Sequence, residues 1–169
     1  MISNNITRML EAAKARYQIF ELPAEKISAI DTATILSISP EIVFKTIVIL
    51  PLKGKPVLCL VSATQTVDLK KVASTLSEKK VHIASQAEAE RITGLQTGGI
   101  SPLALLNKGF RMIMDSSATR YEQIHISGGQ RGLNIRINTE DLVKLIHPII
   151  APISSPLIEK NSEISTNNP

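Results

Sequence analysis

The sequence predicts an α+β fold, in which a mixed β-sheet carries helices on its outside. The first reason is composition, because the 169 residues include 24 isoleucines but only five aromatic residues, and β-branched side chains favour the pleated sheet. The second is element order, since predicted strands and helices intermingle without the regular alternation of a doubly wound parallel sheet. A chain of this length accommodates about one domain, which we place at residues 1–153.

Local patterns predict the elements of the first third. Apolar residues at helical spacing predict an amphipathic helix over 5–16, and 17–21 follows as a short strand. Asp31 is the expected cap of a short helix that ends at Leu36, and Ser39 caps the next turn.

The clearest strand signal is a hairpin. Residues 43–50 and 56–62 are apolar on both faces and are joined by a turn around Gly54, so both belong in the centre of the sheet. A helix over 67–76 and a brief strand over 81–84 are expected next.

The rest of the chain shows caps, short strands and a change of composition. Ser85 opens a capping box, and the helix that it begins should end at Gly94. Three more strands are expected at 111–114, 123–127 and 134–138. A last helix covers 139–146, and the Ser-, Asn- and Pro-rich residues 154–169 read as a disordered tail.

Composition also limits the class of protein. The chain is 43% apolar and 20% charged, which is too apolar for a disordered protein. No apolar run approaches the roughly 18 residues of a membrane-spanning helix, and the first residues lack a secretory signal pattern. The single cysteine, Cys59, allows no internal disulfide and no zinc cluster. We therefore expect a cytoplasmic protein with no membrane attachment and no cofactor.

Six of the eight glycines fall in two clusters between predicted elements. The clusters are Gly94, Gly98 and Gly99, and then Gly128, Gly129 and Gly132. Glycine permits positive φ and lets backbone N–H groups approach a ligand closely. Neither cluster has the spacing of a nucleotide-binding motif. They are therefore either two tight turns or the walls of a backbone-lined pocket.

Lys45 interrupts an otherwise apolar strand. Alternation places it on the face of Val43, Ile47 and Ile49. Such a lysine either snorkels to the surface or presents a fixed cation, with a lowered pKa, to an anion or a developing oxyanion. The spacing leaves both interpretations open.

Conventional catalytic motifs are missing from the sequence. His82, His125 and His147 have no metal-ligand spacing, and Cys59 lies in an apolar strand typical of a core. No Ser/His/Asp set or nucleophile elbow occurs. A hydrolase built on this sequence is therefore expected to work without a protein nucleophile.

Several motifs occur in an order typical of one family. They include Val43-Phe44-Lys45-Thr46, Gly98-Gly99-Ile100-Ser101-Pro102, Ile113-Met114-Asp115 and Ser127-Gly128-Gly129-Gln130-Arg131-Gly132. From about Thr7 to Ile153 the chain resembles the bacterial YbaK-type Cys-tRNA(Pro) deacylases, which are relatives of the editing insertion domain of prolyl-tRNA synthetase. The resemblance implies a barrel-like mixed sheet that hydrolyses the ester of a mischarged tRNA.

The resemblance also implies roles for individual residues. Lys45 matches the family's essential lysine and is the expected catalytic residue. Gly99 matches a glycine whose backbone borders the substrate, and Ser127 matches a serine that binds the aminoacyl moiety. Phe20 falls near an aromatic position of the pocket, where the family usually has tyrosine. The expected substrate-binding set is completed by Gly98, Ile100, Ser101 and Gly128.

For mechanism, the resemblance implies that the thiol of the bound cysteine attacks its own carbonyl. An aminoacyl ester is already activated, so positioning and oxyanion stabilisation can suffice. The implied partners are the acceptor end of tRNA(Pro) and prolyl-tRNA synthetase. The candidates for phosphate contacts are Lys70, Lys71, Lys79, Lys80, Arg131 and Arg136.

Two alternatives stay open. One is a deacylase for Ala-tRNA(Pro) or another small mischarged residue, because Leu103-Ala104-Leu105-Leu106-Asn107 resembles the alanine-specific branch. That branch carries His-Pro-Asn where this chain has Ser127-Gly128-Gly129. The other is a non-catalytic tRNA-binding regulator that kept the fold.

Overall fold

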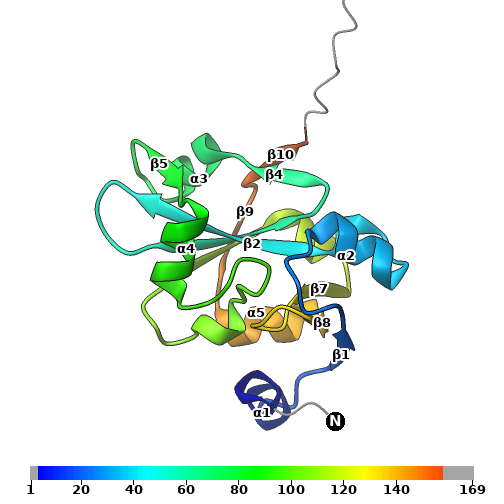
Figure 1. Ribbon diagram of the computed structural model, residues 1–169. Helices are drawn as coiled ribbons and strands as arrows, with labels where there is room; N and C mark the ends of the chain where they lie inside the picture. Colours follow the sequence, from blue (N-terminus) through cyan, green and yellow to red (C-terminus); the bar gives the residue numbers. More distant parts are fainter. Residues whose placement is uncertain (1–3, 158–169) are drawn as a thin grey trace, which may run out of the picture.

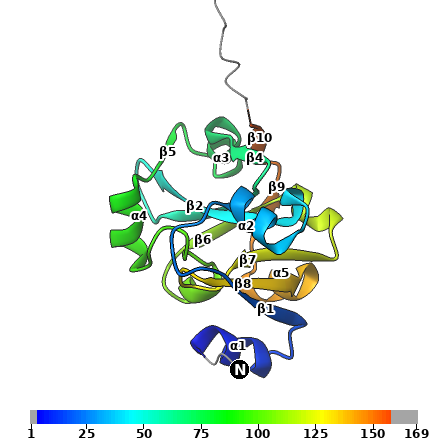
Figure 2. The same ribbon diagram turned by 45° about the vertical axis from the view of Figure 1, so that its right-hand side comes forward.

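The computed structural model describes residues 4–157, which form a mixed α+β fold (Figure 1). The largest sheet has five strands in the order β5-β2-β3-β6-β9. A three-stranded sheet, β1-β8-β7, lies on one side of it, and a short ribbon of β10 and β4 lies on the other (Figures 1 and 2). The mixed sheet with peripheral helices is therefore confirmed.

The helices and strands have the following bounds. The α-helices are α1 (Asn5–Ala12), α2 (Ala29–Leu36), α3 (Leu69–Thr75), α4 (Gln86–Thr93) and α5 (Thr139–Ile146). The strands are β1 (Tyr17–Glu21), β2 (Phe44–Pro51), β3 (Val57–Ser62), β4 (Gln65–Val67), β5 (Val81–Ile83), β6 (Arg111–Asp115), β7 (Gln123–Ser127), β8 (Leu133–Asn138), β9 (Ile149–Ala151) and β10 (Ser154–Pro156). Three 3-10 turns are η1 (Pro40–Ile42), η2 (Leu103–Leu105) and η3 (Ser116–Arg120).

The β2–β3 hairpin occupies the centre of the five-stranded sheet, as its apolar faces predict. Phe44 and Val48 enter a large core shared with the three-stranded sheet, α1 and α5. Ile49 and Cys59 enter a second, smaller core under α3. Because both faces of the hairpin are covered, its strands tolerate no polar side chain except near their ends.

The two larger sheets stay open and meet at one point. An isolated parallel bridge joins Val43, just before β2, to His125 in β7. Within the described residues, none of the sheets closes on itself. The expected barrel is therefore not closed: two open sheets surround a common core. The start of β2 lies where these sheets meet.

Caps bound several helices at the predicted residues, with one exception. Ser85 forms the expected capping box of α4, and Gly94 ends that helix in a left-handed conformation. Asp31 does not cap α2. The cap is Ser28, whose hydroxyl accepts a hydrogen bond from the Asp31 N–H at 3.0 Å. The helix therefore begins earlier than predicted.

The predicted tail begins with a strand. Residues 154–156 form β10, which pairs antiparallel with β4. This pairing also explains why the predicted helix over 67–76 begins only at Leu69, since 65–67 are extended. The rest of the predicted tail, from 158, lies outside the described residues. No helix in 4–157 has the length and apolar character needed to span a membrane.

Candidate functional site

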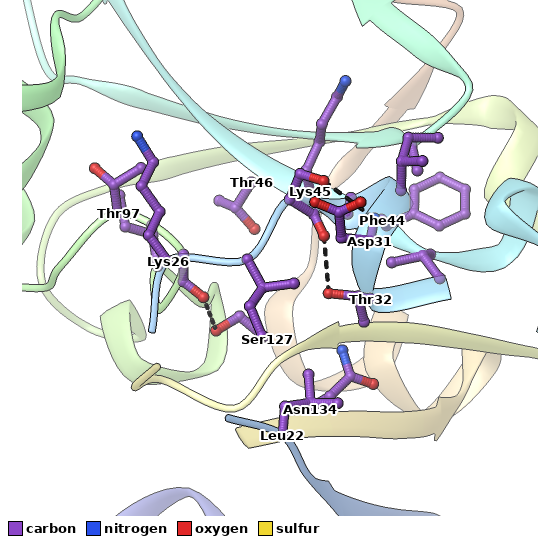
Figure 3. Close-up of a pocket in the computed structure, with 18 of the residues that line it drawn as sticks. Leu22, Lys26, Asp31, Thr32, Phe44, Lys45, Thr46, Thr97, Ser127 and Asn134 are labelled. Atoms are coloured by element: carbon purple, nitrogen blue, oxygen red, sulfur yellow. Dashed lines mark hydrogen bonds between the residues drawn. The ribbon is translucent and has the colours of Figure 1, made fainter. Parts of the chain in front are cut away.

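A cleft of about 520 Å³ opens where β2 begins, between the two larger sheets (Figure 3). One wall comes from 25–32, which is the loop before α2 and the first turn of that helix, and from 43–47 at the start of β2. The facing wall comes from the loop around Gly98 and from Ser127 and 132–134. Its volume lies within the range of sites for small molecules. Segments far apart in the sequence therefore form one site.

Lys45 lines this cleft from β2. It lies on the face of Ile47 and Ile49, as alternation predicts, and is half-buried. Burial lowers the pKa of its amine below the ordinary value of 10.5. Within residues 4–157 the amine forms no ion pair, and Figure 3 shows it pointing away from Ser127. The Lys45 amine therefore does not face the Ser127 side of the cleft in this structure.

Gly98 and Gly99 of the first cluster pack against the second cluster, and Gly98 and Gly132 line the facing wall. The Ser127 hydroxyl donates to the Gly98 carbonyl at 3.5 Å and accepts from the Gly129 N–H at 3.3 Å. A Cβ on Gly99 would lie only 2.8 Å from Cα of Gln130. These residues therefore form tight turns, and part of each turn borders the cleft.

The predicted substrate-binding residues divide into two groups. Ile100, Gly98 and Ser127 line the cleft with Lys45. The remaining loop residues support the wall from behind: Gly99 and Ser101 are buried, and the Gly128 N–H donates to the Leu133 carbonyl at 2.9 Å. These three residues shape the loops without lining the cavity.

Phe20 does not line the cleft. Its ring packs against His125 at a centroid distance of 5.5 Å, and the Arg136 guanidinium lies 5.5 Å from the ring centroid. In the strand register Phe20 faces Asn134, which in turn faces Ser127. Asn134 therefore occupies the position between Phe20 and the cavity, which corrects the expectation for Phe20.

The structure adds polar groups that the expected set of site residues did not include. Lys26 and Asp31 come from the segment before and within α2, and Thr46 follows Lys45 on β2. Thr97 contributes a buried hydroxyl without a hydrogen-bond partner in 4–157. Asn134 is 5% exposed and lines the floor. Only Thr46 had a sequence signal, since it belongs to the Lys45 motif.

Half of the predicted phosphate contacts already have partners within the protein. Lys71 Nζ donates to the Ser154 carbonyl at 2.8 Å, and Arg131 Nε donates to the Thr97 carbonyl at 2.9 Å. Arg136 donates to the Gln18 side chain. The others, Lys70, Lys79 and Lys80, are exposed.

Comparison with known proteins identifies relatives over most of the chain. The model of the aminoacyl-tRNA editing domain matches residues 24–145. EbsC of Enterococcus faecalis, named for Cys-tRNA(Pro)/Cys-tRNA(Cys) deacylase activity, is 32% identical over 153 residues, which cover 89% of this chain and 93% of EbsC. The multifunctional Ser/Thr-tRNA deacylase ProXp-y of Escherichia coli is 27% identical over 93 residues, 54% of this chain and 55% of ProXp-y.

The fold is shared as well. A crystal structure described as a trans-editing enzyme for prolyl tRNA synthetase matches with a TM-score of 0.76 and 23% identity, over 92% of this chain and 99% of the other. The segment matched by the family model contains Lys45, Gly98 and Ser127. The relatives are named tRNA deacylases, as the motifs implied. The chain therefore belongs to the aminoacyl-tRNA editing domain family.

Proposed function

We propose that this protein hydrolyses Cys-tRNA(Pro), releasing free tRNA and cysteine. The observation that carries the proposal is the cleft that Lys45 shares with Ser127 and Gly98, in a chain of the editing family. EbsC, whose name gives the same substrate, matches across nearly its whole length. A cavity of about 520 Å³ accommodates a small aminoacyl group together with part of its nucleoside.

The chemistry needs no nucleophile from the protein. The sulfur of the bound cysteine attacks its own carbonyl carbon, the C–O ester bond breaks, and the ribose oxygen leaves with the proton of the thiol. Water then opens the resulting thioester. Holding sulfur and carbonyl in contact supplies most of the acceleration for such an intramolecular step.

We assign the electrostatic part of the mechanism to Lys45. Negative charge develops on the carbonyl oxygen during the attack, and a cation in a partly dehydrated cleft stabilises it more strongly than water does. The flexible lysine stem lets the ammonium turn toward an oxygen in the cavity. The Ser127 hydroxyl, fixed by Gly98 and Gly129, is suited to hold the amino acid in place.

A second candidate is a deacylase for a hydroxyl-bearing amino acid such as serine. It is favoured by a second named relative. ProXp-y, named as a Ser/Thr-tRNA deacylase, also matches half of the chain.

A panel of charged tRNAs decides between the substrates. Purified protein is mixed with Cys-, Ala- and Ser-tRNA(Pro), with and without prolyl-tRNA synthetase, and the loss of the ester is followed. We expect the highest kcat/KM for Cys-tRNA(Pro). A preference for alanine or serine would replace the proposed substrate, and tight binding of every tRNA without turnover would show a non-catalytic regulator.

A further inference from the structure

His125 is buried behind the floor of the cleft, where it contacts the floor residue Asn134. His125 is 1% exposed, and its Nδ1 lies 2.7 Å from Oδ1 of Asn134. The two residues are diagonal neighbours on β7 and β8, where Ser127 faces Asn134 and His125 faces Arg136. This contact is the one side-chain hydrogen bond that Asn134 makes within the described residues.

The contact leaves the other end of the Asn134 amide directed into the cleft. In Figure 3 the nitrogen of Asn134 points toward Thr32 across the cavity, whereas the oxygen points aside. With the oxygen turned to His125, the end of the amide that faces the cleft is the amino group, which offers only N–H donors to a ligand. The floor of the cleft therefore presents a hydrogen-bond donor that nothing in 4–157 accepts.

The protonated nitrogen of His125 decides this orientation. If Nδ1 carries the proton, it donates to Oδ1 and the Asn134 amino group faces the cleft. If Nε2 carries the proton, Nδ1 becomes an acceptor, the amide turns over and its carbonyl faces the cleft. Burial lowers the pKa of His125, the hydrogen bond to Asn134 raises it, and the Arg136 charge lowers it, and the net shift is downward. The neutral ring is thereby favoured, so the choice between tautomers matters.

We infer that His125 is a positioning residue, which holds Asn134 so that its amino group donates a hydrogen bond to an oxygen of the bound aminoacyl ester. The inference rests on the proposed function for the identity of the ligand. It rests on the structure alone for the orientation of the amide. No sequence motif indicated either residue, because the contact forms only when β7 and β8 pair.

A double-mutant cycle tests the inference. The variants are His125→Leu, Asn134→Leu and the double variant, assayed for kcat/KM on whichever charged tRNA the wild type hydrolyses best. Each single variant should lose about tenfold or more, since each removes one oriented donor. The double variant should be no slower than Asn134→Leu, because His125 acts through Asn134. Losses that multiply, or a His125→Leu enzyme with wild-type kcat/KM, would overturn the inference.

A conservative variant separates positioning from a purely structural role. His125→Asn places an amide N–H close to where Nδ1 was, so it should restore most of the lost kcat/KM. His125→Leu should keep the low kcat/KM, although thermal unfolding is expected to show that both variants are folded. Equal activity in the two variants would contradict the positioning role.

A measurement without turnover keeps this inference distinct from the proposed function. Nitrogen-15 NMR of the wild type reports which ring nitrogen of His125 is protonated, and the Nδ1–H tautomer is expected. The Nε2–H tautomer would overturn the orientation of Asn134 whatever the activity. If no charged tRNA is hydrolysed, the proposed function fails, and the tautomer still decides the orientation.

Discussion

At the scale of single residues, Gly99 lies in a loop that leaves no space for a side chain. It is buried, and an added Cβ would meet backbone atoms of Gln130 at 2.8 and 2.9 Å. Backbone atoms move only with their whole segment, so the contact cannot be relieved by rotating a side chain. Gly99 thus sets the distance between the two loops that form the wall of the cleft opposite β2.

Substitution of Gly99 tests this close approach. Gly99→Ala should lower the free energy of unfolding by about 1–3 kcal/mol, because overpacking forces the loops apart. It should also lower kcat/KM, since Gly98 and Ser127 move with the loops. Thermal unfolding and hydrolysis assays measure the two effects.

Gly94→Asn is the matched control. Gly94 has φ +70° and open space around its Cβ position, and asparagine tolerates the left-handed conformation. This variant should keep both stability and activity close to those of the wild type. Equal losses in the two variants would show that the packing of Gly99 is not special.

The sequence singled out residues that depart from their local pattern. Lys45 stands out in an apolar strand, and the glycine clusters stand out between elements, so their place beside the cleft was predictable. Asn134 has no such signal, because it becomes a floor residue only through its register with Ser127. Phe20 was misplaced for the same reason, since β8 lies between it and the cavity.

At the scale of elements, one buried carboxylate holds the C-terminal strands in place. Asp115 is 3% exposed at the end of β6. It accepts hydrogen bonds from the Ile153 N–H at 2.9 Å, from the Ser117 N–H at 3.2 Å and from the Ser117 hydroxyl. These bonds join the segment between β9 and β10 to the central sheet.

Removing this carboxylate should loosen the C-terminal segment. Asp115→Ala leaves the Ile153 N–H buried without an acceptor, which should cost about 2–3 kcal/mol of unfolding free energy. Amide hydrogen exchange should rise first in β10 and β4. Asp115→Asn keeps an acceptor oxygen and should lose less, and an Asp115→Ala protein as stable as the wild type would refute this role.

Elements with local determinants were predictable from the sequence, and those without were not. The capping box of α4 and the apolar β2–β3 hairpin are encoded in neighbouring residues. By contrast, β4, β9 and β10 have three residues each. Such short strands exist because distant segments pair with them, so their own residues carry little signal.

At the scale of the whole molecule, the formal net charge of +4 favours contact with a polyanion. Of the basic residues expected to contact phosphates, Lys70, Lys79 and Lys80 remain exposed. Lysines at a protein surface contribute to nucleic-acid affinity by releasing counterions. The salt dependence of tRNA hydrolysis therefore reports how many phosphates these lysines contact.

Hydrolysis of the charged tRNA should weaken as salt rises. With about two phosphates contacted, kcat/KM should fall roughly 7- to 12-fold between 50 and 200 mM salt. A small cysteine ester without phosphates serves as the control and should show no such loss. A salt-independent kcat/KM on the tRNA would exclude a phosphate role for these lysines.

The most direct test of the account is the hydrolysis of Cys-tRNA(Pro) in a single turnover by Lys45→Ala. Lys53→Ala is the control, because Lys53 is an exposed lysine in the turn after β2, outside the cleft. Lys45→Ala is expected to stay folded and to hydrolyse the ester no faster than buffer does, whereas Lys53→Ala should match the wild type. A folded Lys45→Ala protein with the wild-type rate would contradict it.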